Sequence, residues 1–256
     1  MVFNSEWISM NGTKGKQLEA SGSTLVLVTP EKQIFFLPIS KEGPFGGKAQ
    51  LIDGTLTQID VGDGKIVGTD GKLGYYRLGI TPDNWKGTDW NWFGSENIIY
   101  VAIGDGKIMG VRNDSKVVAR SGVTTATPHG SSWIDIGGYF KQISIGDGKI
   151  LGVNKINQVF YRYGIDHDNI YGVEWKVLDG VRLKQVDVGY GRIVGVDVSG
   201  HVWQRWGITF SQPFGKGWKM TTAGFFQHIS SGKGVLFGID KKGDIYICHE
   251  KNFPNN

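Results

Sequence analysis

Residues 58–68 read QIDVGDGKIVG, and this stretch returns four more times along the chain. The later copies are YVAIGDGKIMG at 100–110, QISIGDGKILG at 142–152, QVDVGYGRIVG at 185–195 and QHISSGKGVLFG at 227–238. A weaker copy, QLEASGSTLVL at 17–27, precedes them. Terminal repeats commonly depart from the pattern of the others. The chain therefore contains six units of about 42 residues that fill it from end to end.

Within each unit the apolar residues alternate with a period of two, which is typical of β-strands. The Asp-Gly pair inside Gly-Asp-Gly-Lys predicts a tight hairpin, because a type I′ turn needs positive φ at both central residues. A second turn follows about eight residues later, as at Thr69-Asp70-Gly71-Lys72. A fourth segment begins with a tryptophan in most units. Each unit is therefore predicted to contain four antiparallel strands.

Four strands in about 40–45 residues is the size of one propeller blade. Since a blade cannot bury both of its faces alone, six blades are expected to pack side by side. The sequence thus predicts an all-β, six-bladed β-propeller of four-stranded antiparallel blades, with residues 1–256 forming a single domain. The strand at Trp7 is predicted to pair beside Ile245-Tyr246-Ile247 and so to close the ring. An open β-solenoid fits less well because it needs shorter coils and no hairpins.

Composition excludes several other classes of protein. The chain of 256 residues has 40 glycines but only seven prolines and no three-residue period, which excludes collagen. Its single cysteine, Cys248, can form neither an internal disulfide nor a thiolate zinc site. The formal net charge is +4 and the basic residues are scattered, so we expect no nucleic-acid partner. Without a run of about 18 apolar residues we expect no membrane insertion.

The first ten residues, MVFNSEWISM, lack a basic segment followed by an apolar run. This is not the pattern of a secretory signal peptide. We therefore expect a cytoplasmic protein or one secreted by a non-classical route.

The unit as a whole, with Trp, Gln, Gly-x-Gly and Arg at fixed offsets, resembles the tectonin repeat over essentially the whole chain. That family includes tectonins of slime moulds and mushrooms, horseshoe-crab lectins and fish-egg lectins. The resemblance implies a six-bladed propeller that binds carbohydrate, often bacterial lipopolysaccharide or O-methylated glycans, in innate defence or agglutination. One departure concerns a tryptophan that the family carries in the second strand. Its place is taken by Val67, Met109, Leu151, Val194 and Phe237. If that tryptophan stacks on sugar, a platform is absent here; if it is a spacer between blades, nothing functional is lost.

Four arginines recur near the end of the third strand, each followed by x-Gly: Arg77, Arg120, Arg162 and Arg205. A guanidinium offers five fixed donors that suit sugar oxygens, so these residues are candidate ligand contacts. The alternative is structural: each arginine bridges neighbouring blades by donating to backbone carbonyls. The residues alone leave both roles open.

Aromatic residues are the second set of candidates, because an aromatic face packs well on the C–H side of a sugar ring. Those that open the fourth strand are Trp90, Trp133, Trp175 and Trp218. Others lie beside the arginines: Tyr76, Tyr161, Trp203 and Trp206. The alternative for the fourth-strand tryptophans is a wedge that packs sheet against sheet.

Carboxylates give weaker signals. The turn residues Asp63, Asp105 and Asp147 could line one end of a channel and hold a cation, but aspartate is also a common turn residue. The carboxylates Glu19, Asp60 and Asp187 share one place on the inner strands, but they complete no catalytic set. We therefore expect no enzyme, no metal and no cofactor.

The predicted function is a multivalent lectin for glycans on bacterial or other foreign cell surfaces. A protein-interaction scaffold that binds no sugar is the alternative. Aromatic residues spread over several blade boundaries favour the lectin, whereas one contiguous patch favours the scaffold. Assembly into a homo-oligomer stays open.

Overall fold

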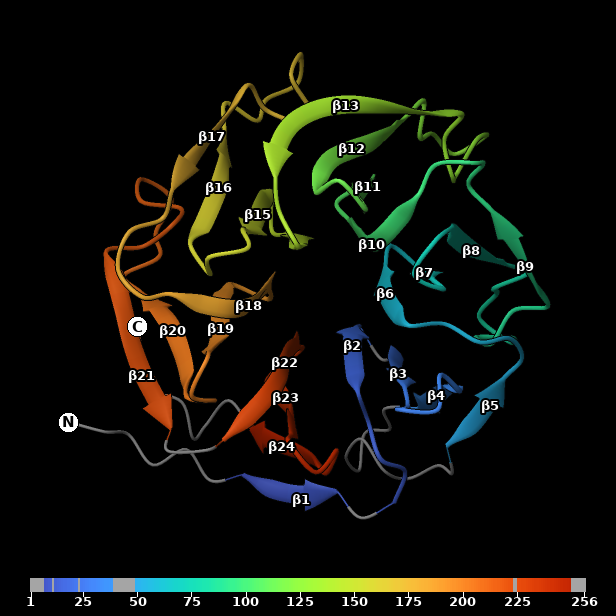
Figure 1. Ribbon diagram of the computed structural model, residues 1–256, viewed down its shortest axis with the longest axis horizontal. Coiled ribbons are helices and arrows are strands. Elements are labelled where there is room, and N and C mark those ends of the chain that lie inside the picture. Colours follow the sequence, from blue (N-terminus) through green and yellow to red (C-terminus); the bar gives the residue numbers. More distant parts are fainter. Residues whose placement is uncertain (1–6, 11, 23, 39–48, 223–224, 250–256) are drawn as a thin grey trace. The chain divides into compact units, whose positions relative to one another are not determined.

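The computed structural model describes residues 7–10, 12–22, 24–38, 49–222 and 225–249. In these residues the only regular structure is β-strand, and 24 strands form six four-stranded antiparallel sheets. The protein is a six-bladed β-propeller, which confirms the predicted fold class (Figure 1). No helix that could cross a membrane occurs in the described part of the chain.

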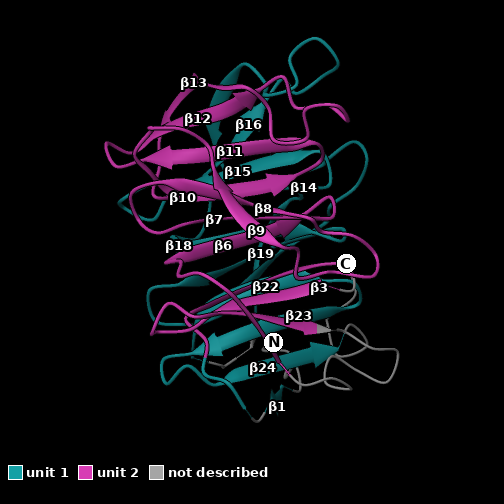
Figure 2. Ribbon diagram, turned by 90° about the vertical axis from the view of Figure 1, so that its right-hand side faces the viewer, with its two compact units in different colours: residues 1–14, 144–256 teal, residues 15–143 magenta. Residues whose placement is uncertain are grey.

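The chain divides into two compact units, coloured separately in Figure 2. Residues 15–143 form the unit that contains blades 1 to 3. Blade 1 contains β2 (Gln17–Ser21), β3 (Thr24–Val28), β4 (Ile34–Pro38) and β5 (Gln50–Ile52). Blade 2 contains β6 (Gln58–Gly62), β7 (Lys65–Thr69), β8 (Gly74–Leu78) and β9 (Asp89–Trp92). Blade 3 contains β10 (Ile98–Gly104), β11 (Lys107–Arg112), β12 (Lys116–Ser121) and β13 (Ser132–Tyr139).

Residues 1–14 and 144–256 form the other unit, which contains blades 4 to 6 apart from Gln142 and Ile143 at the start of blade 4. Blade 4 contains β14 (Gln142–Gly146), β15 (Lys149–Val153), β16 (Val159–Tyr163) and β17 (Glu174–Val177). Blade 5 contains β18 (Leu183–Gly189), β19 (Arg192–Asp197), β20 (Val202–Trp206) and β21 (Gly217–Thr222). Blade 6 contains β22 (Phe226–Gly232), β23 (Val235–Asp240), β24 (Ile245–His249) and β1 (Ile8–Met10). The single domain over residues 1–256 stays a prediction.

The N-terminal strand completes the last blade. Strand β1 pairs antiparallel with β24, with Ile8 opposite Ile247 and Met10 opposite Ile245. Met10 is buried in the core, whereas Ile8 is exposed. The predicted pairing of the two ends of the chain in one sheet is therefore confirmed.

The Gly-x-Gly hairpins have the predicted turn geometry. In blade 2, Asp63 has a φ of 52° and Gly64 a φ of 68°. Positive φ at both central residues also occurs at Asp105-Gly106, Asp147-Gly148 and Tyr190-Gly191. These values match a type I′ turn, whose twist suits the flanking strands.

In blades 2 and 4 the glycine before this turn has a different role, which is to permit close packing of blades. A Cβ atom on Gly62 would lie 2.5 Å from the carbonyl oxygen of Ile103 in blade 3. The equivalent Gly146 of blade 4 would place a Cβ 2.3 Å from the carbonyl oxygen of Val188 in blade 5. Only glycine allows the inner strands to approach this closely.

Side chains of the inner strands hydrogen-bond to the backbone of the next blade. Gln58 donates from Nε2 to the carbonyl of Val101 (2.8 Å) and accepts from its N–H (2.9 Å). Gln185 makes the same pair of bonds with Ile229, at 2.8 and 3.2 Å. The recurrent glutamine of the repeat thus joins two blades by satisfying backbone groups that burial would otherwise leave unpaired.

The place where relatives carry a tryptophan in the second strand is core in this protein. Val67, Met109, Leu151, Val194 and Phe237 are all 0% exposed. A side chain at this position faces no solvent, so the missing tryptophan removes no exposed platform.

Candidate functional site

The four recurrent arginines are buried, with exposed fractions of 4 to 7%. Each Nε atom donates to the carbonyl oxygen nine residues further along the chain, in the loop between the third and fourth strands. The acceptors are Lys86 for Arg77 (2.7 Å), His129 for Arg120 (2.9 Å), Tyr171 for Arg162 (2.7 Å) and Phe214 for Arg205 (2.7 Å). The repeat thus uses each arginine to hold the loop of its own blade.

A second donor of the guanidinium binds the following carbonyl. Nη2 of Arg120, Arg162 and Arg205 donates to Gly130 (2.9 Å), Gly172 (3.1 Å) and Gly215 (3.0 Å), respectively. Because two parallel donors meet two successive carbonyls, the planar guanidinium fits this loop in a way that a lysine could not.

Each guanidinium also lies over the ring of the tryptophan that opens the fourth strand. The distances from the guanidinium carbon to the ring centroid are 5.2 Å for Arg77–Trp90, 5.1 Å for Arg120–Trp133, 5.3 Å for Arg162–Trp175 and 5.3 Å for Arg205–Trp218. These are cation–π distances. The two predicted sets of site residues are therefore brought together, pair by pair, inside each blade.

In Arg120 and Arg205 the third nitrogen of the guanidinium, Nη1, donates to the preceding blade. Arg120 Nη1 donates to the carbonyl of Phe93 (3.2 Å), and Arg205 Nη1 to that of Asp179 (3.4 Å). Burial lowers the pKa of Arg205, while the charge of Asp179 opposes this effect. Each of these arginines thus donates to backbone carbonyls, as the structural alternative expects. Direct contact with a sugar stays a prediction.

Arg77 differs because its partner in the preceding blade is a side chain. Both of its Nη atoms contact the carboxylate of Asp53, and Nη1 lies 3.1 Å from Oδ2. This hydrogen bond to Arg77 holds the pKa of Asp53 below its usual value, against a smaller effect of burial. The indole N–H of Trp90 donates to the backbone carbonyl of Asp53 at 2.7 Å. The boundary between blades 1 and 2 is therefore joined by an ion pair.

Tyr76 and Tyr161 pack against rings from the next blade. Tyr76 packs on His129, with centroids 3.8 Å apart and planes 18° apart. Tyr161 packs on Phe214, with centroids 4.1 Å apart. Burial, followed by the charges of Lys65 and Arg120, lowers the pKa of His129 to about 4. One face of each tyrosine is thus covered by the protein itself.

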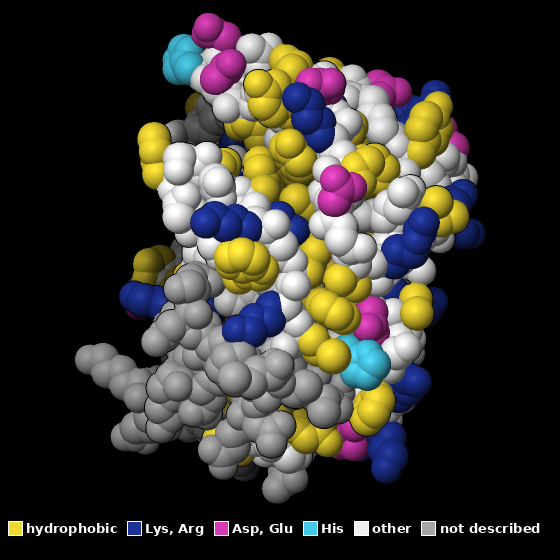
Figure 3. All heavy atoms as spheres, turned by 90° about the vertical axis from the view of Figure 1, so that its left-hand side faces the viewer, with side chains coloured by type: hydrophobic (Ala, Val, Ile, Leu, Met, Phe, Trp, Pro, Cys, Tyr) yellow, Lys and Arg dark blue, Asp and Glu magenta, His cyan; other side chains and the backbone are white. Residues whose placement is uncertain are grey.

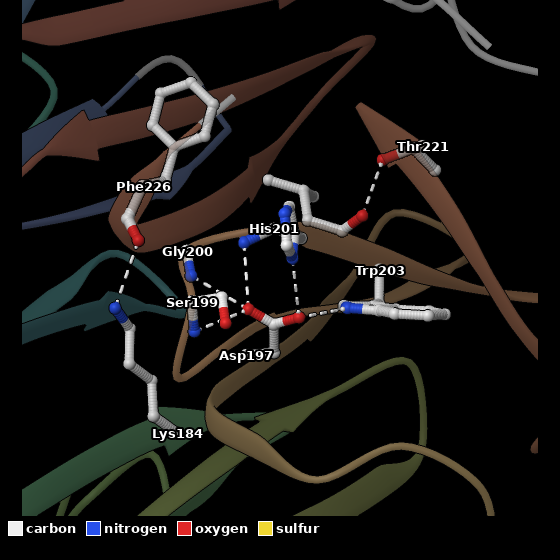
Figure 4. A network of polar contacts seen from close by, with 9 residues as sticks. Lys184, Asp197, Ser199, Gly200, His201, Trp203, Thr221 and Phe226 are labelled. Atoms are coloured by element: carbon white, nitrogen blue, oxygen red, sulfur yellow. Dashed lines mark hydrogen bonds and ion pairs between the residues drawn. The ribbon is translucent and has the colours of Figure 1, made fainter. Parts of the chain in front are cut away.

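Trp203 belongs to a polar network around Asp197 (Figure 4). One carboxylate oxygen accepts from the N–H groups of Ser199 (2.9 Å), Gly200 (2.8 Å) and His201 (2.9 Å). The other lies 3.0 Å from Nδ1 of His201 and accepts from the indole of Trp203 at 2.9 Å. Burial acts to raise the pKa of Asp197, but the bonds from Trp203 and His201 outweigh it and hold this pKa below its usual value.

Strand registers place Trp203 differently from the two tyrosines. Trp203 is the equivalent of Tyr75, because Trp203 lies opposite Gly195 and Tyr75 lies opposite Gly68. Each donates a hydrogen bond to an aspartate of its own blade, Trp203 to Asp197 and Tyr75 to Asp70. Tyr76 and Tyr161 are one position closer to their arginines. Trp203 therefore stabilises the hairpin between β19 and β20 instead of stacking on the next blade.

Trp206 is the predicted site residue that is most exposed, at 45%. It follows Arg205 directly, and Tyr163 follows Arg162 in the same way with an exposure of 49%. The same position is Leu78 in blade 2 and Ser121 in blade 3. Two neighbouring blades thus present half-exposed aromatic side chains at one repeat position.

Lysines accompany both of these aromatic residues, and the sequence did not indicate them. Lys216 Nζ lies 5.9 Å from the ring centroid of Trp206, and Lys176 Nζ lies 3.5 Å from that of Tyr163. One sequence feature could have pointed to Lys216. It lies two residues before the fourth-strand tryptophan, where blades 2, 3 and 4 carry the uncharged residues Thr88, Ser131 and Val173.

The carboxylates of the inner strands and turns are used in joining blades. Asp63 accepts from the N–H of Gly106 (2.7 Å) and Asp147 from that of Gly191 (2.6 Å). Asp60 accepts from Ile103 (2.8 Å). Across the described ranges, no three His, Cys, Asp or Glu side chains are grouped so that they could hold a metal ion.

A protein-family model described as "Tectonin domain" matches residues 97–241, which is more than half of the chain. No curated protein sequence matches this one.

Several solved structures resemble the chain at low sequence identity. A luciferin-regenerating enzyme has a TM-score of 0.66 and 9% identity, over 99% of this chain and 98% of that chain. Human WBSCR16 has a TM-score of 0.59 and 12% identity, over 93% of this chain and 77% of that chain. The Pan2 WD40 domain of Neurospora crassa has a TM-score of 0.56 and 10% identity, over 100% and 98%. At these identities the likeness shows the fold alone.

Proposed function

The chain belongs to the tectonin family, and from this membership we propose that it is a carbohydrate-binding protein and not an enzyme. The proposed ligands are microbial surface glycans, such as lipopolysaccharide or O-methylated sugars. The proposed role is a multivalent lectin that acts in innate defence or agglutination.

The observation that carries the proposal is the pair of half-exposed aromatic side chains at one repeat position. Tyr163 is 49% exposed and Trp206 is 45% exposed, and each lies directly beside a rigid arginine–tryptophan pair. An aromatic face offers a large contact area to the C–H side of a sugar and loses little side-chain entropy. A platform of this kind on a firmly held strand suits a shallow sugar site.

Repetition of such sites compensates for the weakness of each one. Linked sites that engage an array of ligands can raise avidity by roughly 10²–10⁴ without any new contact. A microbial surface presents such an array. An O-methyl group adds about 0.8 kcal/mol for each carbon buried in an apolar niche, which supports methylated sugars as ligands.

The experiment is a glycan array that includes natural and O-methylated sugars, probed with the full chain. The variants are Tyr163→Ser and Trp206→Ser, since blade 3 carries serine at the same repeat position. Ile156, a 59% exposed residue in the hairpin between β15 and β16, provides the matched control Ile156→Ser. We expect the double variant to lose about tenfold or more in apparent affinity, because each lost aromatic contact is worth roughly 1 kcal/mol.

Absence of binding by the wild type at high protein density would contradict the lectin function. Binding that the double variant and the Ile156→Ser control retain equally would leave the function in place and exclude these two residues as its site.

A second candidate function, a scaffold that binds another protein, is favoured by one specific feature. Phe210, in the loop before β21, is fully exposed, and Ile170 and Val173, in the loop before β17, are 47% and 57% exposed. Exposed large apolar side chains of this kind suit a protein surface. Substituting Phe210 by serine should leave the glycan array unchanged if the lectin function is correct.

A further inference from the structure

The two exposed aromatic positions differ in what surrounds them. The face seen in Figure 3, on the side where Figure 1 places β17 and β21, shows hydrophobic side chains bordered by Lys and Arg. Both Tyr163 and Trp206 have a lysine beside the ring. The difference lies in how each lysine is held and in whether a carboxylate neutralises it.

Trp206 is held against the outer strand of its own blade. Gly217 lies directly opposite it on β21, and a Cβ atom on this glycine would lie 2.9 Å from the indole Nε1. The absence of a side chain at Gly217 therefore lets the indole lie close to the backbone of β21. With 45% of Trp206 exposed, part of the ring remains open to solvent.

The lysine beside Trp206 is positioned by a second glycine. A Cβ atom on Gly207 would lie 3.0 Å from Cγ and 3.2 Å from Cδ of Lys216. The aliphatic stem of Lys216 thus packs over Gly207, while Nζ lies 5.9 Å from the centroid of the Trp206 ring. Packing of the stem reduces the freedom that a surface lysine otherwise has, and it keeps the ammonium group over the indole of Trp206.

The charge of Lys216 is not matched by a carboxylate. Within the described part of the chain, no Asp or Glu side chain forms an ion pair with it. Lys176, beside Tyr163, is instead paired with Glu174 at 3.0 Å. That hydrogen bond raises the pKa of Lys176, so its charge is retained but neutralised locally. The two blades therefore present one aromatic–cation site and one aromatic site of balanced charge.

We propose that Trp206 and Lys216 form a subsite for an acidic sugar, one that carries an anionic group on its exocyclic carbon. This inference rests on the proposed lectin function and adds the ligand class. A sugar ring in van der Waals contact lies about 4 Å from the indole. A sugar that packs on the indole beside Lys216 therefore brings a carboxylate or phosphate one bond outside its ring toward the ammonium group, which lies 5.9 Å from the centroid. The Tyr163 site, where Glu174 neutralises Lys176, does not share this preference.

The test compares three uronic acids with their neutral hexoses: glucuronic, galacturonic and mannuronic acid against glucose, galactose and mannose, all as methyl glycosides. The matching hexose 6-phosphates form a third arm that separates carboxylate from phosphate. Binding is followed by NMR titration of the full chain, using the indole N–H signal that disappears in Trp206→Ser. We expect at least one acidic sugar to shift this signal with roughly fivefold higher affinity than its neutral counterpart, the range of a half-exposed ion pair.

Two matched variants separate charge at the site from charge on the surface. Lys216→Gln is expected to abolish the preference and leave the affinity for the neutral hexose unchanged. Lys176→Gln removes the same formal charge one blade away and is expected to retain the preference. The preference should also weaken when salt is raised from about 50 mM to about 500 mM, because added ions screen an exposed pair.

The proposal is overturned if no acidic sugar shifts the Trp206 signal, or if Lys216→Gln retains the preference. It is also overturned if Lys176→Gln abolishes it as fully as Lys216→Gln. Should the same protein still bind neutral or methylated sugars on the array, the lectin function survives and only the acidic subsite fails. If the array is also negative, both proposals fail.

Discussion

The buried guanidinium groups hold the loops before the outer strands, and Arg205 allows this role to be measured. The substitution Arg205→Met removes the charge and keeps an apolar stem of similar length. It breaks the bonds to Phe214 (2.7 Å) and Gly215 (3.0 Å), the longer one to Asp179 (3.4 Å), and the cation–π contact with Trp218 at 5.3 Å.

The size of the effect follows from these contacts. A hydrogen bond from a charged donor contributes about 1.5–3 kcal/mol. The carbonyls of Phe214 and Gly215 lie in a half-buried loop that water can reach, so the low end applies and the two short bonds give about 3 kcal/mol. The cation–π contact adds about 1 kcal/mol, and relief of burying the charge offsets a similar amount. We therefore expect a loss of about 3 kcal/mol in the free energy of unfolding.

The assay is urea unfolding followed by circular dichroism, with a thermal scan beside it. At about 2–4 °C for each kcal/mol, the unfolding midpoint should fall by roughly 6–12 °C. Arg205→Lys should recover less than half of the loss, because an ammonium group cannot donate along two parallel directions. Arg182→Met is the control: Arg182 is exposed and makes one bond, to the carbonyl of Ile156 at 2.8 Å. We expect it to lose less than about 1 kcal/mol.

Equal losses for Arg205→Met and Arg182→Met would refute this reasoning. A variant Arg205→Met that keeps its stability but no longer binds glycans would refute it more directly. That outcome would show that the guanidinium contacts the ligand and that its bonds to the loop contribute little.

Three further predictions concern other parts of the fold. Deleting residues 1–12 removes β1 and exposes the edge of the last blade, so the thermal midpoint should fall far more than truncation of an ordinary terminus allows; an unchanged midpoint would exclude a structural role for this strand. Gly62→Ala places a Cβ 2.5 Å from the carbonyl oxygen of Ile103 and should lower the free energy of unfolding, measured by urea titration, by about 2–3 kcal/mol. At Gly64 an added Cβ meets open space, but the φ of 68° disfavours alanine, so Gly64→Ala should lower it by about 1 kcal/mol. The pKa of His129 is lowered from 6.5 to about 4, so the unfolded chain takes up a proton at a higher pH than the folded chain does. The contribution of neutral His129 to the free energy of unfolding is therefore complete above pH 6.5 and is lost as the pH falls toward 4. His129→Phe should reduce the fall in the unfolding midpoint over that pH range, and an unchanged pH profile would contradict the lowered pKa of His129.

The repeat alone was sufficient to predict the fold, because the turns that define each strand depend on residues next to one another in the sequence. Asp63 and Gly64 reveal a type I′ turn from their own preferences for positive φ, and five clear copies with a weaker sixth fix the number and length of the units. The pairing of β1 with β24 was also predictable, since the chain starts at the fourth strand of the repeat and ends after the third.

The surroundings of the site residues were harder to predict because their partners lie in irregular loops. The arginine at the position of Arg162 recurs in the sequence, but its acceptor is the backbone carbonyl of Tyr171. Because every residue has such a carbonyl, the residue type at position 171 does not identify the acceptor. Tyr161 stacks on Phe214 from the next blade, and the equivalent partner of Tyr76 is a histidine. Because the loop residues vary from blade to blade, no fixed spacing of side-chain types identifies them.

The hydrogen bonds between inner strands have a consequence for how such a chain can change. Gln58 bonds the N–H and carbonyl of Val101, and Gln185 does the same with Ile229, so blades 2 and 5 contact the main chain of blades 3 and 6 at these points. A main chain offers the same groups whatever side chain it carries. At these points the side chains of the receiving strand can therefore change without a matching change in the glutamine of the preceding blade. Such a scaffold allows the exposed side chains of one blade to change separately from those of the next.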